Sequence, residues 1–194
     1  MEKYIIRKET KNDYDEVERV VRKSFWNVYH SGCLEHYLLH IVRKSDIFIP
    51  SLDFVIEING KIIGQIVFAK AKIKENNKEQ EVLTMGPFCI LPEYQKQGYG
   101  KTLLDYALKE AEKLSFPAVL IGGNIDFYKR CGFKYAKEYN IFYNGLKETD
   151  DASFFLCRLL KQNHFTNDLK TFYLPEEYLV DEEKALEYDK KFIC

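Results

Sequence analysis

The chain has 194 residues, which is enough for one sizeable hydrophobic core and short for two full domains. Apolar residues make up 46% of it and charged residues 30%, as in ordinary globular proteins, and the formal net charge of -1 argues against nucleic-acid binding, where a basic stripe is expected. Because no apolar run approaches the roughly 20 residues of a membrane helix and the N-terminus has no secretory segment, we expect a cytoplasmic protein that binds no membrane.

The cysteines and histidines predict no metal site and no disulfide framework. The five cysteines are scattered and form no CxxC pair: Cys33, Cys89, Cys131, Cys157 and Cys194. Paired spacing is typical of zinc ribbons and disulfide-rich folds, so reduced thiols are expected here. His36 and His40 have helical i, i+4 spacing but no obvious third ligand, and we expect them on a polar helix face.

The first half of the chain predicts a strand, two helices and a β-hairpin. These elements are expected at residues 4–7, 14–25, 34–42, 53–58 and 61–68. The pair Asn59-Gly60 separates two β-rich runs and can supply the positive φ angles of a type I′ turn, which makes the hairpin the clearest local prediction.

The second half predicts alternating strands and helices. After a charged loop at 74–81, the expected elements are a strand at 82–90, a helix at 98–114, a short buried strand at 118–121, a brief helix ending at Tyr128 and a last long strand at 153–160. Gly86-Pro87 lies inside a strand, where it favours a bulge. Alternating strands and helices together with an antiparallel hairpin predict an α/β fold with a mixed sheet.

A glycine loop connects the strand at 82–90 to the helix that follows it. Its pattern is Gln-x-x-Gly-x-Gly at Gln95, Gly98 and Gly100. A P-loop would need glycine at position 95 and a dinucleotide fingerprint would need glycine where Leu103 stands, so both patterns fail. Glycines let the backbone approach a ligand, and a helix N-terminus attracts a pyrophosphate. A tight structural turn is the alternative, and the loop alone does not decide between the two.

Two motifs resemble those of the GNAT superfamily of acetyl-coenzyme A-dependent N-acetyltransferases. Residues 90–100 resemble motif A of that family, and Phe-Tyr-Lys-Arg-Cys-Gly-Phe at 127–133 resembles motif B, in the family's order and over roughly residues 3–160. A narrower resemblance is to a bacterial subgroup labelled YhbS-like. It rests on residues 25–26, 46–50, 85–88, 154–156 and 172–175. Gly123-Asn124-Ile125 departs from the Gly-Asp-Pro turn of that subgroup, which puts a role for its acidic residue in doubt.

The resemblance implies a GNAT fold whose sheet splays between its fourth and fifth strands, with an acetyltransferase domain at 1–160 and a C-terminal extension at 161–194. It implies acetyl-coenzyme A as cosubstrate, with no metal, and Tyr128 as the acid that protonates the departing thiolate. The implied cofactor-binding residues are Phe88, Cys89, Ile90, Gln95, Lys96, Gln97, Gly98, Tyr99, Gly100, Lys101 and Asn124.

The expected reaction is direct transfer of an acetyl group to a primary amine of a small molecule, in a ternary complex. Alternatives are a covalent route through Cys89, a longer acyl donor, a protein amine as acceptor, and a module that binds acyl-coenzyme A without catalysis. Glu57 and Glu81 lie on or near strands that could face the cleft and are candidate bases, although solvated strand carboxylates are the favoured interpretation. The aromatic residues Phe25, Trp26, Tyr29 and Phe48 could line the acceptor pocket or belong to the core. A homodimer is plausible by family analogy alone.

Overall fold

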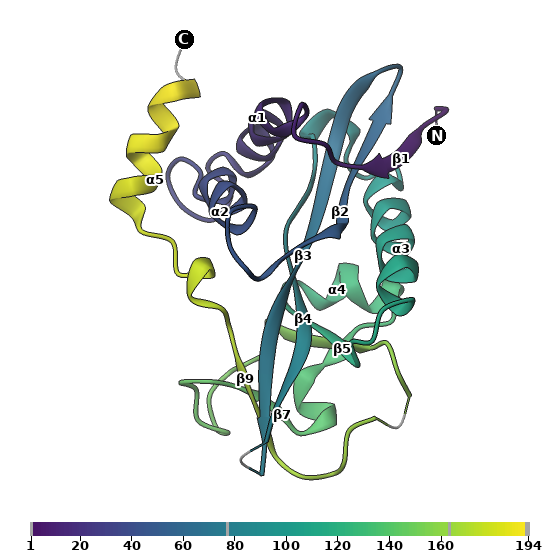
Figure 1. Ribbon diagram of the computed structural model, residues 1–194, viewed down its shortest axis with the longest axis vertical. Coiled ribbons are helices and arrows are strands. Elements are labelled where there is room, and N and C mark those ends of the chain that lie inside the picture. Colours follow the sequence, from purple (N-terminus) through teal and green to yellow (C-terminus); the bar gives the residue numbers. More distant parts are fainter. Residues whose placement is uncertain (1, 77, 163, 193–194) are drawn as a thin grey trace.

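A mixed sheet runs through the centre of the computed structural model, which describes residues 2–76, 78–162 and 164–192 (Figure 1). Its neighbouring strands follow the order β1-β2-β3-β4-β5-β8-β6, and β9 pairs with both β3 and β7. The strands are β1 (Ile5–Lys8), β2 (Phe48–Ile58), β3 (Lys61–Glu75), β4 (Lys78–Ile90), β5 (Ala118–Gly122), β6 (Lys134–Tyr135), β7 (Ile141–Tyr143), β8 (Phe155–Leu159) and β9 (Lys170–Tyr173). This arrangement confirms the expected mixed sheet.

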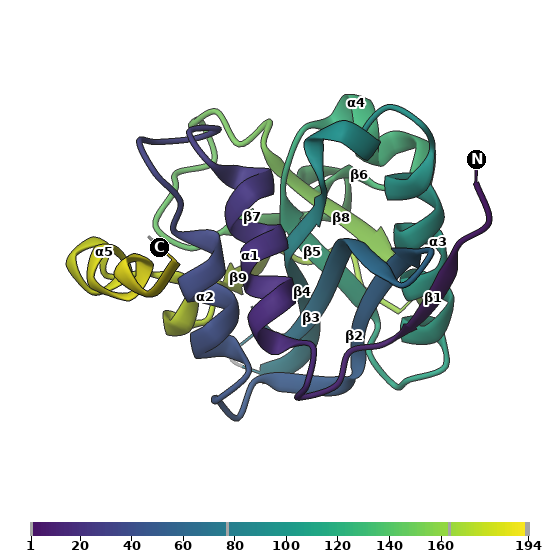
Figure 2. The ribbon, with the colours of Figure 1, turned by 90° about the horizontal axis from the view of Figure 1, so that it is seen from above.

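Helices cover both faces of the sheet. Figure 2 shows α1 and α2 on one side of β3 and β4 and α3 on the other, with α5 outside α2. The helices are α1 (Tyr14–Phe25), α2 (Glu35–Val42), α3 (Tyr99–Glu112), α4 (Ile125–Tyr128) and α5 (Glu182–Asp189). The helix predicted at 98–114 is confirmed as α3, and the leucines of its inner face, Leu103, Leu104 and Leu108, are buried in the core. No helix among the described residues is long and apolar enough to span a membrane.

The hairpin prediction is confirmed by the turn between β2 and β3. Asn59 and Gly60 both have positive φ, at 51° and 79°, as a type I′ turn requires. The predicted bulge in β4 is also confirmed. The register between β3 and β4 shifts between Ile66 and Phe68, opposite Gly86, whose φ is 149°.

The prediction of a charged loop at 74–81 is wrong. β3 continues to Glu75 and β4 begins at Lys78, and these two residues are register partners. Buried Ala71 and Ile73 alternate with outward lysines, which is the pattern of a half-buried strand. β9 pairs with this end of β3, so the charged run has a second neighbouring strand that the sequence did not reveal. The strand expected at 153–160 exists as β8, but β9 follows it.

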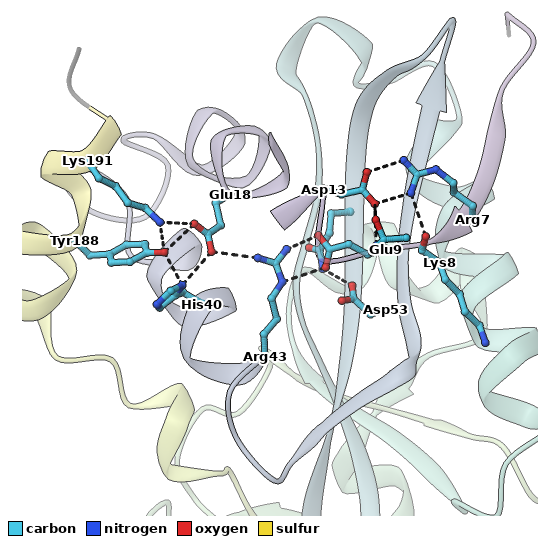
Figure 3. A network of polar contacts seen from close by, with 12 residues as sticks. Arg7, Lys8, Glu9, Asp13, Glu18, His40, Arg43, Asp53, Tyr188 and Lys191 are labelled. Carbon is cyan, nitrogen blue, oxygen red and sulfur yellow. Dashed lines mark hydrogen bonds and ion pairs between the residues drawn. The ribbon is translucent and has the colours of Figure 1, made fainter. Parts of the chain in front are cut away.

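α5 is held against α1 and α2 by buried charges (Figure 3). Glu18 of α1 is 2% exposed and accepts hydrogen bonds from Lys191 Nζ at 2.7 Å and from the Tyr188 hydroxyl at 2.8 Å. Burial alone would raise the pKa of Glu18, but these two bonds and the charges of Lys191 and Arg43 together outweigh it, and the pKa is lowered. The charged form of Glu18 therefore ties the C-terminal helix to the first helix.

Arg43 extends this network toward the sheet. Its Nη1 donates to Glu18 Oε1 at 3.2 Å, its Nε donates to Glu9 Oε2 at 3.0 Å, and its guanidinium lies 4.0 Å from the centre of the Tyr14 ring. Burial raises the pKa of Glu9 and that of neighbouring Asp53, so this carboxyl pair retains a proton that neutralises part of its charge.

The expectation that His36 lies on a polar helix face is wrong. Its side chain is fully buried, with its ring centre 5.1 Å from that of Phe192. Nε2 lies 3.2 Å from Asp189 Oδ1, yet neither ring nitrogen makes a hydrogen bond to the described residues.

The cysteines fit the expectation of reduced thiols: Cys33, Cys89, Cys131 and Cys157 are free, and Cys194 lies outside the described residues.

The burial of His36 predicts a pH-dependent stability. Burial lowers the pKa of His36 from 6.5 to about 4, so below pH 6.5 the unfolded chain binds a proton that the folded chain excludes. The histidine should therefore cost about 1–2 kcal/mol of unfolding free energy between pH 7.5 and pH 5. We expect His36→Leu to remove this cost, measured as the difference in pH slope between variant and wild type by urea denaturation.

Exposed His164 provides the matched control, and His164→Leu should keep the wild-type slope. Because the pKa values of Glu9 and Asp53 are raised, these carboxyls stabilise the folded chain as the pH falls, which opposes the effect of His36. Their effect is the same in the wild type and in both histidine variants. Identical slopes for His36→Leu and wild type would contradict the assignment.

Candidate active site

A cleft of about 320 Å³ lies where β4 and β5 separate. The two strands are parallel and pair at Leu83–Val119 and Thr84–Leu120, after which β4 continues to Ile90 with β3 as its partner. This confirms the predicted splay between the fourth and fifth strands. The cleft is lined by Phe25, Tyr29, Glu35, Leu38, Thr84, Met85, Gly86, Pro87, Phe88, Ile121, Gly122, Tyr128, Tyr143, Phe154, Phe155, Phe172, Leu174 and Tyr178.

The three β4 residues implied as cofactor contacts have different surroundings. Phe88 lines the cleft, while Ile90 is buried and lies 3.6 Å from the position a Cβ would take on Gly100. Cys89 is buried, does not line the cleft, and burial raises the pKa of its thiol to about 12. A buried thiol that remains protonated is a poor nucleophile, which disfavours a covalent route through Cys89.

The glycine loop brings a helix N-terminus to the end of β4. Lys96 and Gly98 have left-handed backbone conformations, with φ of 59° and 95°, and α3 begins at the next residue. The first hydrogen bond of the helix runs from Thr102 N to Gly98 O at 3.0 Å. The N–H groups of 99–101 precede this bond and carry the positive end of the helix dipole, which suits an anion such as a pyrophosphate.

Several predicted side-chain contacts in this loop are used within the protein. Gln95 Nε2 donates to Ile90 O at 2.9 Å, and Gln97 Nε2 donates to Glu93 O at 2.9 Å. Lys101 Nζ pairs with Asp105 one turn along α3. The loop therefore offers a ligand mainly its backbone N–H groups.

Two more implied contacts are structural in the free protein. The Tyr99 ring is buried, and its hydroxyl accepts a hydrogen bond from Glu2 N at 3.0 Å, so only its backbone faces the loop. Asn124 Oδ1 accepts from Asp126 N at 2.8 Å and thereby caps α4. Asn124 lines an adjoining hollow of about 540 Å³ that shares Tyr29 with the cleft.

Tyr128 ends α4 and lines the cleft. Its ring centre lies 5.0 Å from that of Phe127 and 5.4 Å from that of Phe133, and one ring edge packs on Gly123. Its hydroxyl makes no hydrogen bond to the described residues. Burial raises the pKa of Tyr128, and the nearby Tyr29 phenol raises it further, so the hydroxyl retains its proton at neutral pH. The group can therefore donate a proton within the cleft.

Neither carboxylate suggested as a base lies in the cleft. Glu57 pairs with Arg7 Nε at 3.0 Å on the outer side of β2, and Glu81 is exposed on the hairpin of β3 and β4. Glu35 is the one carboxylate residue of the cleft lining, as far as the structure describes the chain. The sequence missed it because its position depends on how the loop before α2 folds over the sheet, which no local pattern indicates.

The aromatic cluster suggested as pocket or core is divided between several places. Phe25 and Tyr29 line the cleft. Trp26 is 43% exposed, and the Arg22 guanidinium lies 4.1 Å from the centre of the Trp26 ring. Phe48 packs against the main core. Of the two alternatives, Tyr29 therefore fits the pocket and Phe48 the core, whereas Phe25 both lines the cleft and packs against the core.

The C-terminal segment contributes a wall of the cleft. The Tyr178 hydroxyl donates to Gly86 O at 2.9 Å, at the β4 bulge, and Leu174 lies beside it in the lining. The segment 164–192 thus takes part in the cleft as well as in the sheet. Within the described ranges, no group of three or more His, Cys, Asp or Glu residues is arranged to hold a metal ion.

Residues 51–135 match the family model described as the acetyltransferase (GNAT) domain. Two curated relatives are each 27% identical. "Uncharacterized N-acetyltransferase YjhQ" of Escherichia coli aligns over 85 residues, 44% of this chain and 47% of that protein. "Uncharacterized N-acetyltransferase MJ1207" of Methanocaldococcus jannaschii aligns over 143 residues, 68% of this chain and 61% of that protein. The chain therefore spans about half of the first relative and three-fifths of the second.

Among the solved structures that share the fold are two with a bound coenzyme A species. The GNAT family N-acetyltransferase YhbS from Escherichia coli, in complex with CoA, has a TM-score of 0.74 at 21% identity, covering 92% of this chain and 93% of that one. A GNAT family acetyltransferase from Brucella melitensis, in complex with acetyl-CoA, has a TM-score of 0.71 at 21% identity, covering 92% and 99%. These likenesses confirm the expected GNAT fold.

The contact between Tyr128 and Gly123 gives a testable prediction. A Cβ at Gly123 would lie 2.4 Å from Tyr128 Cε2, so Gly123→Ala must displace the ring and should lower the unfolding free energy by about 1–3 kcal/mol. At the adjacent Gly122 a Cβ would lie 3.6 Å from Phe154 Cδ2, an ordinary contact. Gly122→Ala is therefore the control and should cost less in the same urea titration; equal losses would contradict the packing described.

Proposed function

We propose that the chain transfers the acetyl group of acetyl-coenzyme A to a primary amine, as the match of residues 51–135 to the GNAT acetyltransferase family model suggests. The observation that carries the proposal is a cleft that holds both an open β4 edge and a protonated Tyr128, next to the α3 N-terminus. A Cβ on Gly100, in the first turn of α3, would lie 3.7 Å from the ring of Phe88, which lines the cleft. The CoA and acetyl-CoA complexes of the two structural neighbours support the choice of cosubstrate.

In the proposed complex, the backbone of residues 88–90 pairs with the amide groups of the pantetheine arm, as an edge strand pairs with an added strand. The N–H groups of 99–101 hold the pyrophosphate. A backbone N–H on the β4 edge stabilises the negative charge that develops on the thioester oxygen during attack. Tyr128 donates its proton to the departing sulfur.

A small-molecule acceptor suits the cleft better than a protein side chain. The lining is largely aromatic and encloses about 320 Å³, a volume typical of small-ligand sites. The proposal therefore commits to a small amine and to direct transfer between two bound substrates.

Acetyl-coenzyme A should stabilise the protein without any acceptor. At about 100 times its dissociation constant it should add roughly 2.7 kcal/mol, a rise in melting temperature of roughly 5–10 °C for a chain of this size. Lys101→Glu places a negative charge at the start of α3 and should reduce the rise several-fold. Exposed Lys109, near the other end of α3, supplies the control, and Lys109→Glu should respond as the wild type does. No rise at millimolar ligand would refute the cofactor site.

Replacing Tyr128 by Phe separates catalysis from binding. Loss of the proton donor should lower kcat by about 10²–10⁴-fold, while the thermal shift with acetyl-coenzyme A is kept. Turnover is followed as coenzyme A release with the best amine from a panel. Tyr106→Phe, on α3 outside the cleft, should leave kcat unchanged. If Tyr128→Phe keeps full activity, the acid is another group.

A further inference from the structure

The cleft carries a single unneutralised charge. Glu35 is the first residue of α2, its side chain is 17% exposed, and no Lys or Arg belongs to the described lining. Its Oε2 accepts from Leu34 N at 3.1 Å and from Cys33 Sγ at 3.3 Å. Its Oε1 accepts no hydrogen bond from the described residues. The two bonds to Oε2 therefore hold the carboxylate in place, and Oε1 is left for a donor that enters the cleft.

The rest of the lining around this carboxylate is apolar and aromatic. The rings of Phe25, Tyr29, Tyr143, Phe154 and Tyr178 contribute to it. Aromatic faces attract a cationic nitrogen and pack well against an apolar body. A carboxylate on the acceptor would meet the charge of Glu35 with no cation in the lining to offset it, and a second ammonium would find no second carboxylate.

We propose that the acceptor is a small primary monoamine with an aromatic or branched apolar body and no carboxylate, and that Glu35 binds its ammonium group and accepts its proton. This inference rests on the proposed acetyl transfer and specifies its substrate class. The Glu35 side chain is itself 17% exposed, so the proton it takes has a route to solvent; His30 Nε2 lies 3.8 Å from its Oε2, too far for a hydrogen bond.

Glu35 takes one proton from the ammonium group and releases it to solvent. The freed nitrogen lone pair forms a C–N bond to the thioester carbonyl carbon. The C–S bond then breaks and sulfur takes the proton of the Tyr128 hydroxyl. The second proton that leaves the nitrogen returns to the Tyr128 oxygen, and the products are the amide and free coenzyme A.

The test compares three acceptors. Coenzyme A release is measured with 2-phenylethylamine, with phenylalanine, which adds a carboxylate to the same skeleton, and with spermidine, a linear amine that lacks the aromatic ring and adds two further amino groups. For the wild type, kcat/KM should be at least about tenfold higher for 2-phenylethylamine than for the other two, in line with the cost of leaving a buried charge unpaired.

Glu35→Gln keeps an oxygen for the Leu34 N–H and removes the charge. It should lower kcat/KM for 2-phenylethylamine about 100-fold, bring the ratio between 2-phenylethylamine and phenylalanine to within a few-fold, and leave the thermal shift with acetyl-coenzyme A unchanged. Glu35→Asp should restore part of the ratio, which a purely structural role would not produce. Exposed Glu81 lies outside the cleft, so Glu81→Gln is the control and should behave as the wild type.

Several results would overturn the inference. Equal or better turnover of phenylalanine or spermidine would remove the substrate class, and unchanged kinetics in Glu35→Gln would remove the role of Glu35. Turnover of none of the three amines, with the acetyl-coenzyme A shift intact, would also overturn the acceptor class while leaving the cofactor site standing. Absence of both shift and turnover would count against the proposed transfer itself.

Discussion

The site depends on one feature of the sheet, which is that β4 extends beyond its parallel partner β5. The two strands pair at Leu83 and Thr84, and from Met85 to Ile90 β4 is supported by β3. An exposed strand edge is normally a liability, because its N–H and C=O groups invite another strand. In this protein the edge faces a cleft walled by side chains and ends at a helix N-terminus, so it can serve a ligand without being available to a second sheet.

The walls of the cleft are held from outside by contacts far from it. Arg43 links Glu9, beside the sheet, to Glu18 of α1, and Glu18 in turn holds the C-terminal helix. Buried ion pairs contribute little net stability because desolvation offsets their attraction, but they fix which groups face each other. Here they fix α2, whose first residue is Glu35. On the other side, Tyr178 ties the chain before α5 to the β4 bulge. Long-range charge pairing thus helps to position this wall of the cleft.

The features predicted correctly from sequence are those that local chemistry decides. Asn59-Gly60 can form its turn whatever surrounds it, Gly86-Pro87 disturbs any ladder, and the spacing of Leu103 and Leu104 determines the inner face of α3. The features that were missed depend on distant partners. The charged end of β3 becomes a strand because β9 pairs with it, and His36 is buried because α5 covers it. The motifs indicated the cofactor side of the site, whereas no pattern indicated Glu35.

This division follows from how the two halves of the site are built. The proposed cofactor side uses mostly backbone: an open strand edge and the first turn of α3, whose neighbouring side chains Gln95 and Lys101 are engaged with the protein itself. Backbone geometry requires a short motif with glycines in fixed places, so it leaves a local signature. The proposed acceptor side uses side chains from α1, α2 and the C-terminal segment, brought together only by folding. Because the two halves share few residues, acceptor preference can change through the second set while the strand edge and the helix N-terminus remain intact.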